Sequence, residues 1–159
     1  MSTGHLIAPI AEHHLADIAA IEVRLFDQPT TASALASLFA NPPFIGFVLK
    51  TDLPLHRGVA GYTFALNDGQ GADLVSIGTA PEFQRSGYGL SLLRHLTAAL
   101  HKRGADTLML EVAFDNMAAQ RLYARAGFSE VAVRPRYYRR AHGAVDALVM
   151  RLLTRHAVP

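Results

Sequence analysis

The spacing of apolar residues changes along the chain, and this change predicts the order of its elements. A short apolar run predicts a first strand over His5–Pro9. Apolar residues at helical spacing then predict a helix over Leu15–Leu25, which Pro29 ends. A second helix follows, capped by Thr30 or Thr31 and ended by the two prolines after Asn41.

Beyond these helices, runs rich in β-branched and aromatic residues predict strands. The predicted strands are Phe44–Lys50, Val59–Leu66, Ala72–Thr79, Thr107–Val112, Ser129–Tyr138 and Val145–Leu153. Because Thr107–Val112 is nearly all apolar, we expect it to be buried on both faces. Two further helices are predicted over Gly87–Arg103 and Asn116–Ala126, each followed by a glycine at the position where a left-handed residue ends a helix.

The order of these elements predicts the fold class. A polar turn near Asp52–Arg57 and a hairpin signal at Asn67–Gly71 connect three consecutive strands. Strand–helix–strand units follow them. We therefore expect an α/β (mixed α+β) protein with one mixed, mostly antiparallel sheet of about seven strands and helices on both faces. No linker, repeat or low-complexity tract divides the chain, so residues 1–159 are predicted to form a single domain.

Composition and charge narrow the function classes. Half of the residues are apolar and 18% are charged, which is typical of a globular protein. A net charge of +2 is too small to predict nucleic-acid binding. No apolar run is long enough to span a bilayer, and the N-terminus lacks a secretory pattern, so we expect a cytoplasmic protein without a membrane partner. The chain has no cysteine and its eight histidines are scattered, so no metal site is predicted.

The turn between the fourth strand and the third helix is a candidate anion site. Gln84–Gly89 contains two glycines directly before the helix, where unpaired N–H groups carry a partial positive charge. Glycines let the backbone approach a ligand, and Arg85 adds a charge, so a diphosphate would fit. The third glycine of a dinucleotide fingerprint is replaced by Leu92, and the Gly-Lys-Ser/Thr of a Walker loop is absent. Taken alone, such a turn is at least as typical of an ordinary strand-to-helix connection as of an anion site.

Three motifs in sequence order resemble one family. Gln84-x-x-Gly87-x-Gly89 resembles the Q/R-x-x-G-x-G/A signature of the GNAT acetyltransferases, whose loop binds the pyrophosphate of acetyl-CoA. LEVAFDNMAAQRLYARAGF, residues 110–128, is similar to the L-E-V-x-x-x-N-x-x-A-x-x-L-Y-x-x-x-G-F pattern of that superfamily. VRPRYY with the later DALVM resembles the closing hairpin of the bacterial ribosomal-protein alanine N-acetyltransferases. The resemblance covers about half of the chain, roughly Leu74–Leu153.

The resemblance implies a GNAT-type domain, acetyl-CoA as cosubstrate, no metal, and two catalytic residues. It assigns Glu111 as the general base and Tyr123 as the general acid that protonates the leaving thiolate. Without the resemblance, Glu111 would be read as an outward-facing glutamate and Tyr123 as a core aromatic. Asn116 is expected to cap its helix and to contact the pantetheine arm.

The resemblance also implies the binding residues. The strand Ile77, Gly78, Thr79 is expected to pair with the pantetheine amides and to polarise the thioester oxygen through a backbone N–H. The expected pyrophosphate residues are Gln84, Arg85, Ser86, Gly87, Tyr88 and Gly89. Tyr137 and Tyr138 are expected to hold the acceptor. The basic run Arg134–Arg140 is either a lid over the acceptor or a solvated hairpin.

The implied function is transfer of an acetyl group from acetyl-CoA to a primary amine by direct attack, and the resemblance favours the N-terminal alanine of a ribosomal protein as the acceptor. The alternative is a GNAT acetyltransferase for a small-molecule amine or another protein. A CoA-binding sensor and a nucleic-acid-binding module are less favoured. The chain departs from the family where a prolyl-tryptophan pair is expected after the first helix, because it has LFDQPTTASA there and no tryptophan. We expect a monomer or a homodimer.

Overall fold

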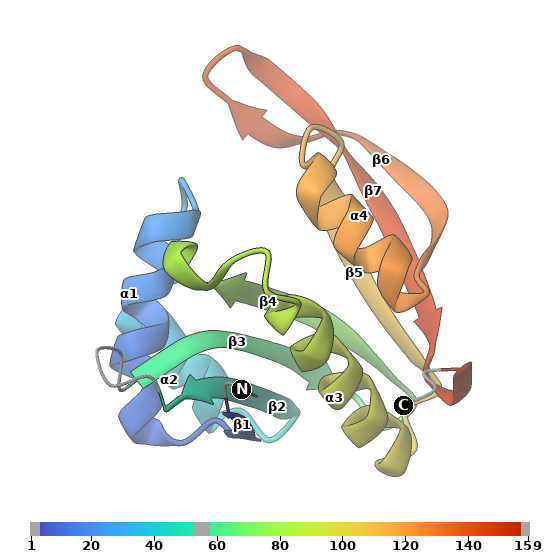
Figure 1. Cartoon of the computed structure of the whole chain (residues 1–159). Helices are drawn as coiled ribbons and strands as arrows, with labels where there is room; N and C mark the ends of the chain where they lie inside the picture. The colour runs from blue at the N-terminus through green and yellow to red at the C-terminus, as the bar shows by residue number, and fades with distance from the viewer. Residues whose placement is uncertain (1–3, 53–57, 157–159) are drawn as a thin grey trace.

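The computed structural model describes residues 4–52 and 58–156. Every helix and strand predicted above is present within them, although the turn expected near Asp52–Arg57 lies mostly outside the described residues. The helices are α1 (Leu15–Leu25), α2 (Ala32–Ala40), α3 (Tyr88–Lys102) and α4 (Met117–Ala126). The strands are β1 (His5–Pro9), β2 (Phe44–Thr51), β3 (Gly58–Asn67), β4 (Gly71–Thr79), β5 (Thr107–Ala113), β6 (Ser129–Arg140) and β7 (Gly143–Leu153) (Figure 1).

The seven strands form one sheet in the order β1-β2-β3-β4-β5-β7-β6. Only β4 and β5 run parallel, joined through α3; every other neighbouring pair is antiparallel. The mixed, mostly antiparallel sheet predicted from the sequence is therefore confirmed. The last two strands exchange places in space, since β7 lies between β5 and β6.

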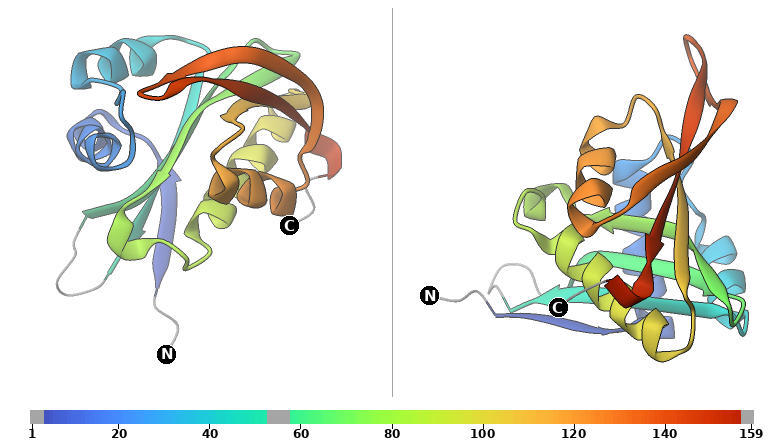
Figure 2. Two further views of the ribbon diagram at one scale, coloured as in Figure 1. Left: turned by 90° about the horizontal axis from the view of Figure 1, so that it is seen from above. Right: turned by 90° about the vertical axis from the view of Figure 1, so that its right-hand side faces the viewer.

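Neighbouring residues of β3 show that helices cover both faces of the sheet. A methyl group added at Gly61 would lie 3.1 Å from Leu92 of α3. The next residue, Tyr62, donates a hydrogen bond from its hydroxyl to Glu22 of α1. Because successive strand residues point to opposite faces, α3 and α1 lie on opposite sides of the sheet. Figure 2 shows α1 and α2 on one side and α3 and α4 on the other.

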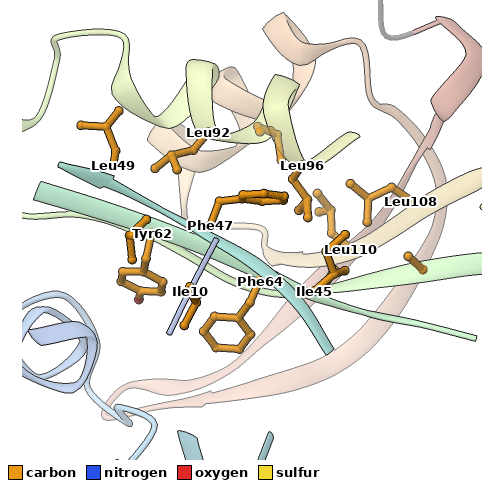
Figure 3. Packing of buried hydrophobic residues seen from close by; sticks show 14 of the residues in the cluster. Ile10, Ile45, Phe47, Leu49, Tyr62, Phe64, Leu92, Leu96, Leu108 and Leu110 are labelled. Carbon is orange, nitrogen blue, oxygen red and sulfur yellow. The ribbon is translucent and has the colours of Figure 1, made fainter. Parts of the chain in front are cut away.

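The core is continuous across the sheet. Phe47, Leu92 and Leu96 pack between the strands and α3, while Tyr62 and Phe64 fill the opposite face (Figure 3). Leu49, Tyr62, Phe64, Leu92 and Leu96 have no exposed surface at all. Burying side chains of this size is the main favourable term in folding.

The prediction that β5 is buried on both faces is wrong. Leu108, Leu110 and Val112 are buried, but the alternate residues Thr107, Met109 and Glu111 are only half-buried. The physical reason is that α1 and α2 pack against β2, β3 and β4. The second face of β5 is therefore not covered by these two helices.

β4 and β5 pair over only a short stretch. Their parallel ladder joins Gly71–Asp73 to Thr107–Met109, and no later pair continues it in the described chain. Beyond this ladder the two strands diverge, as Figure 1 shows. One edge of β4, from Leu74 to Thr79, therefore keeps backbone groups that no strand neighbour binds, and these groups need another partner.

None of the helices in the described residues combines the length and the apolar character needed to cross a membrane.

Candidate active site

The glycine turn places the N-terminus of α3 beside the diverging end of β4. Gly87 has a φ of +80° and precedes the first residue of α3, and no side chain caps the helix at this position. Arg85 also has a positive φ, of 62°, which is uncommon for a residue other than glycine. Left-handed residues in a short turn before a helix are typical of backbone concavities that bind anions, so this turn is a candidate anion site.

Gly89 allows close packing around the turn, in addition to giving the backbone conformational freedom. A methyl group at this position would lie 3.3 Å from Leu122 of α4, and 3.9 Å from Thr79 Oγ1. The absence of a side chain thus lets α3 approach α4 and β4 closely. The Gln84 amide donates a hydrogen bond of 3.1 Å to the Thr79 carbonyl, which fixes the turn to the end of β4. Tyr88 packs near Phe83 and His5.

The end of β4 carries Ile77, Gly78 and Thr79, the residues that are expected to pair with the pantetheine amides. The register of this strand is also irregular, at a position before Gly78. The β3–β4 register shifts where Ser76 pairs with Phe64 and Leu74 pairs with Ala65, which leaves Val75 as the extra residue. Gly78 instead admits the Tyr62 ring, because a methyl group there would lie 2.8 Å from Tyr62 Cε1.

Glu111 of β5 is held by residues of the β6–β7 hairpin. Its carboxylate accepts a hydrogen bond from Arg134 Nη1, and the two side chains are 29% and 52% exposed. The Tyr138 hydroxyl donates to the backbone carbonyl of Glu111 at 3.3 Å. Interaction with the Glu111 carboxylate raises the pKa of Tyr137. The structure thus brings the predicted base together with both tyrosines predicted to hold the acceptor.

A bulge in β6 positions these residues. Arg134 pairs with Ala147 of β7 and Tyr138 pairs with Val145, so residues 135–137 lie opposite one residue of β7. Arg136 has a φ of 54° within this bulge, and its N–H donates to Asp146 Oδ1 at 2.8 Å. A bulge of this kind redirects side chains locally, and here Tyr137 packs edge-on against Tyr138.

Tyr123 of α4 is 8% exposed and packs against Phe128. Burial raises the pKa of its hydroxyl, and the nearby Tyr138 adds a smaller upward contribution. Tyr138 therefore lies near both predicted catalytic residues, since its hydroxyl also donates to the backbone carbonyl of Glu111. Asn116 caps α4 as predicted, because its side-chain oxygen accepts a hydrogen bond from the N–H of Ala119 at 3.1 Å.

A buried polar cluster adjoins β4 and was not predicted from the sequence. Glu22 of α1 is 2% exposed, yet it accepts hydrogen bonds from the Tyr62 hydroxyl, from Ser76 Oγ at 2.7 Å, and from the N–H of Thr30 at 2.9 Å. The sequence did contain an indication of this cluster, because Glu22 falls on the apolar face of α1, four residues after Ile18. The cluster fixes α1 and the segment after it to the back of β4.

Among the described residues, no group of three or more histidine, cysteine or acidic side chains is arranged to hold a metal ion. The polar groups gathered near the diverging strands are instead one carboxylate, several phenols and a guanidinium. Such a set can move protons and bind a cation or an anion, and it offers the general acid and base of a group transfer.

Comparisons with known proteins point to one family. Residues 15–128 match the acetyltransferase (GNAT) family. The [ribosomal protein bS18]-alanine N-acetyltransferase of Escherichia coli strain K12 is 46% identical over 81 residues, which are 51% of this chain and 55% of that protein. The chain thus spans about half the length of this curated relative in the match.

Two further similarities cover most of the chain. A putative [ribosomal protein bS18]-alanine N-acetyltransferase of Bacillus subtilis is 30% identical over 131 residues, which are 82% of this chain and 83% of that protein. The crystal structure of the ribosomal-protein-S18-alanine N-acetyltransferase from Escherichia coli superposes with a TM-score of 0.86 and 32% identity. That superposition covers 95% of this chain and 94% of the other.

Proposed function

This chain belongs to the acetyltransferase (GNAT) family, and from that membership we propose that it moves the acetyl group of acetyl-CoA to a primary amine by direct attack. The family predicted from the sequence motifs is thereby confirmed. We further propose that the acceptor is the N-terminal alanine of a ribosomal protein. The activity for which the relatives are named supports this choice, and so do the paired tyrosines beside Glu111.

One observation carries the proposal. A partly exposed carboxylate, Glu111, just beyond the ladder that joins β4 and β5, and a buried phenol, Tyr123, both lie near Tyr138. One group can accept a proton and the other can donate one. A reaction in which an amine loses a proton and a thiolate gains one requires such a pair.

The residues of the turn and of β4 fit an acetyl-CoA molecule as substrate. Gly87 and Arg85, with the N-terminus of α3, would bind the diphosphate. The edge of β4 at Ile77, Gly78 and Thr79 has backbone groups that no strand neighbour binds in the described chain, so it can pair with the amides of the pantetheine arm. A backbone N–H on the same edge would stabilise the developing oxyanion.

The proton steps balance across these two residues. An N-terminal amine has an ordinary pKa of about 8, so most of it is protonated at neutral pH and must first lose one proton to the solvent; the neutral amine then attacks. Glu111 takes a proton from the amine as the new C–N bond forms. Tyr123 gives its proton to the sulfur as the C–S bond breaks. Because burial keeps the Tyr123 phenol protonated, it is available as a donor at neutral pH.

The test is the substitution Glu111→Gln, measured with acetyl-CoA and a peptide that begins with a free alanine. We expect kcat/KM for the peptide to fall by about 100-fold or more, the usual scale for general acid–base catalysis. Glu130→Gln is the matched control, because Glu130 is an exposed glutamate on β6. Acetyl-CoA binding should be unchanged in both variants.

An unchanged rate in Glu111→Gln would overturn the assigned base. A mixture of peptides beginning with alanine, serine or methionine, together with a polyamine, tests the acceptor separately. Acetylation of the polyamine alone would keep the acetyltransferase and replace the acceptor with a small amine. A cytoplasmic location and a monomeric or dimeric state remain predictions.

A further inference from the structure

The pairing of Glu111 with Arg134 raises a question for the proposed reaction. The carboxylate that should receive a proton from the acceptor is already bound by a side chain of the same protein. A guanidinium donates protons but does not accept them near neutral pH, so Arg134 cannot relay a proton from the amine. Arg134 must therefore leave Glu111, or share it, when the acceptor amine arrives.

The surroundings of the Arg134 guanidinium form a cation site. Glu111 supplies a carboxylate oxygen, and the Tyr137 ring lies below the guanidinium, with Arg134 Cζ 4.2 Å from the ring centroid. A carboxylate combined with an aromatic face is a set that also binds alkylammonium groups. We use the name cation site for the Glu111 carboxylate together with the Tyr137 ring.

The hairpin does not depend on Arg134 for its shape. The bulge is fixed by the backbone contact of Arg136 to Asp146, and the ladder resumes where Tyr138 pairs with Val145. Tyr138 is held separately through its hydroxyl bond to Glu111. Arg134 itself is half-exposed, and exposed ion pairs are weak. Its side chain can therefore move away while the cation site remains in place.

We propose that the cation site is where the acceptor's protonated amine docks, and that Arg134 fills this site in the free protein and is displaced by the acceptor. The inference rests on the proposed function for the identity of the acceptor. Arg134 is then a positioning residue that competes with the substrate: it keeps the Glu111 carboxylate and the Tyr137 ring arranged around a positive charge, and it lowers the apparent affinity for amines.

The effect of this competition on the apparent affinity for amines has an expected magnitude. When one side chain must leave before a ligand binds, the apparent dissociation constant is divided by the fraction of protein in which the site is free. The loss of a half-exposed ion pair together with a cation–π contact corresponds to about a threefold to tenfold change. Arg134→Gln should therefore bind amines about threefold to tenfold more tightly than the unaltered protein, and Arg134→Lys should lie between them.

The first measurement needs no acetyl transfer. The full chain with 13C-labelled glutamate side chains is titrated with ethylammonium chloride, and the carboxyl carbon of Glu111, assigned from the Glu111→Gln spectrum, is followed by NMR. We expect half-saturation at about threefold to tenfold lower concentration in Arg134→Gln. Arg151→Gln is the matched control, because Arg151 is an exposed arginine of β7 two residues from the partner of Glu111. Sodium chloride at the same concentration corrects for ionic strength.

The second measurement uses the alanine peptide at saturating acetyl-CoA. The KM for the peptide should fall in Arg134→Gln by a similar factor, while the KM for acetyl-CoA stays the same. Equal ethylammonium affinity in Arg134→Gln and the unaltered protein, or a higher peptide KM in the variant, would overturn the proposal, since Arg134 would then be irrelevant or a direct acceptor contact. Tighter ethylammonium binding without acetylation of any peptide would keep the cation site and remove the proposed function.

Discussion

At the scale of single residues, Tyr123 shows how burial can prepare a side chain for acid chemistry. Its ring packs against Phe128 and is almost fully enclosed by α4 and its neighbours. Burial disfavours the charged phenolate, so the pKa of Tyr123 lies above the ordinary value of 10.0. The hydroxyl consequently stays protonated over the whole range in which an acetyl transfer would be measured.

Removal of this hydroxyl should affect the rate far more than the stability. We expect Tyr123→Phe to lower kcat for the alanine peptide by about 100-fold. The free energy of unfolding should change by no more than about 1 kcal/mol, because the ring that packs against Phe128 is kept. Steady-state rates and urea unfolding check the two halves of this prediction. A normal kcat would show that another donor protonates the thiolate.

The sequence predicted some residue roles better than others. Asn116 caps α4 and Gly127 adopts the left-handed conformation after it, because both roles depend on local backbone geometry. Glu22 was not predicted, because its partners Tyr62 and Ser76 come from two distant strands. Only the folded structure shows that three hydrogen-bond donors surround this charged residue on the apolar face of α1.

At the scale of elements, the crossing of α1 over β4 depends on one glycine. A methyl group at Gly78 would lie 2.8 Å from the Tyr62 ring and 2.9 Å from Leu25 Cδ1. Both neighbours belong to packed elements, β3 and α1, so neither can move without disturbing the Glu22 cluster. The need for glycine here comes from side-chain packing.

We therefore expect Gly78→Ala to lower the free energy of unfolding by about 1–3 kcal/mol, the usual cost of overpacking a core. Gly58→Ala is the matched control on β3, because among the described residues a methyl group there would meet Asp17 Oδ2 alone, at 4.0 Å. That variant should be neutral or slightly stabilising. Urea unfolding followed by circular dichroism measures both. Equal stability of the two variants would contradict the packing argument.

The bulge in β6 could not be read from its sequence. The run from Ser129 onward predicts a regular strand, and a non-glycine residue with positive φ has no reliable local signal. Arg136 adopts this conformation where Asp146 of the neighbouring strand receives its N–H. The burial of β5 failed as a prediction for a similar reason: an apolar strand does not reveal which of its faces a helix will cover.

At the scale of the whole molecule, buried tyrosines should make the fold sensitive to alkali. Burial is the main cause that raises the pKa of both Tyr62 and Tyr123 above the ordinary value of 10.0, and the Glu22 contact adds to it at Tyr62. The folded chain thus keeps two protons that the unfolded chain releases. Since unfolding then releases protons, stability is fully present below pH 10 and falls as the pH rises above it.

The predicted slope is about 1.4 kcal/mol per pH unit for each buried tyrosine once the unfolded phenol is ionised. Urea unfolding at several pH values from 8 to 11 would measure it. Tyr123→Phe should remove about half of this slope and leave the Glu22–Tyr62 contact intact. A slope that is the same in this variant would mean that other groups cause the alkaline loss.

The element order, the mixed sheet and the presence of helices on both faces were predictable, because hydrophobic period and turn residues are local properties. The placement of β7 between β5 and β6, and the divergence of β4 from β5 after three residue pairs, were not. Both depend on contacts between elements far apart in the sequence, such as those of α3 with β2 and β3. The residues of the candidate site could therefore be predicted from sequence motifs, whereas its shape depends on the packing of the whole chain.

The bulge in β6 restricts how this chain can change length. From Arg134 to Tyr138 the bulged strand advances four residues while β7 advances two, so both side chains stay on the face that carries Glu111. Since side chains alternate between faces, an insertion or deletion of one residue here would turn one of them away. Relatives that keep both contacts to Glu111 should therefore differ in this segment by even numbers of residues. An odd difference would mark a lineage that recognises its acceptor by other means.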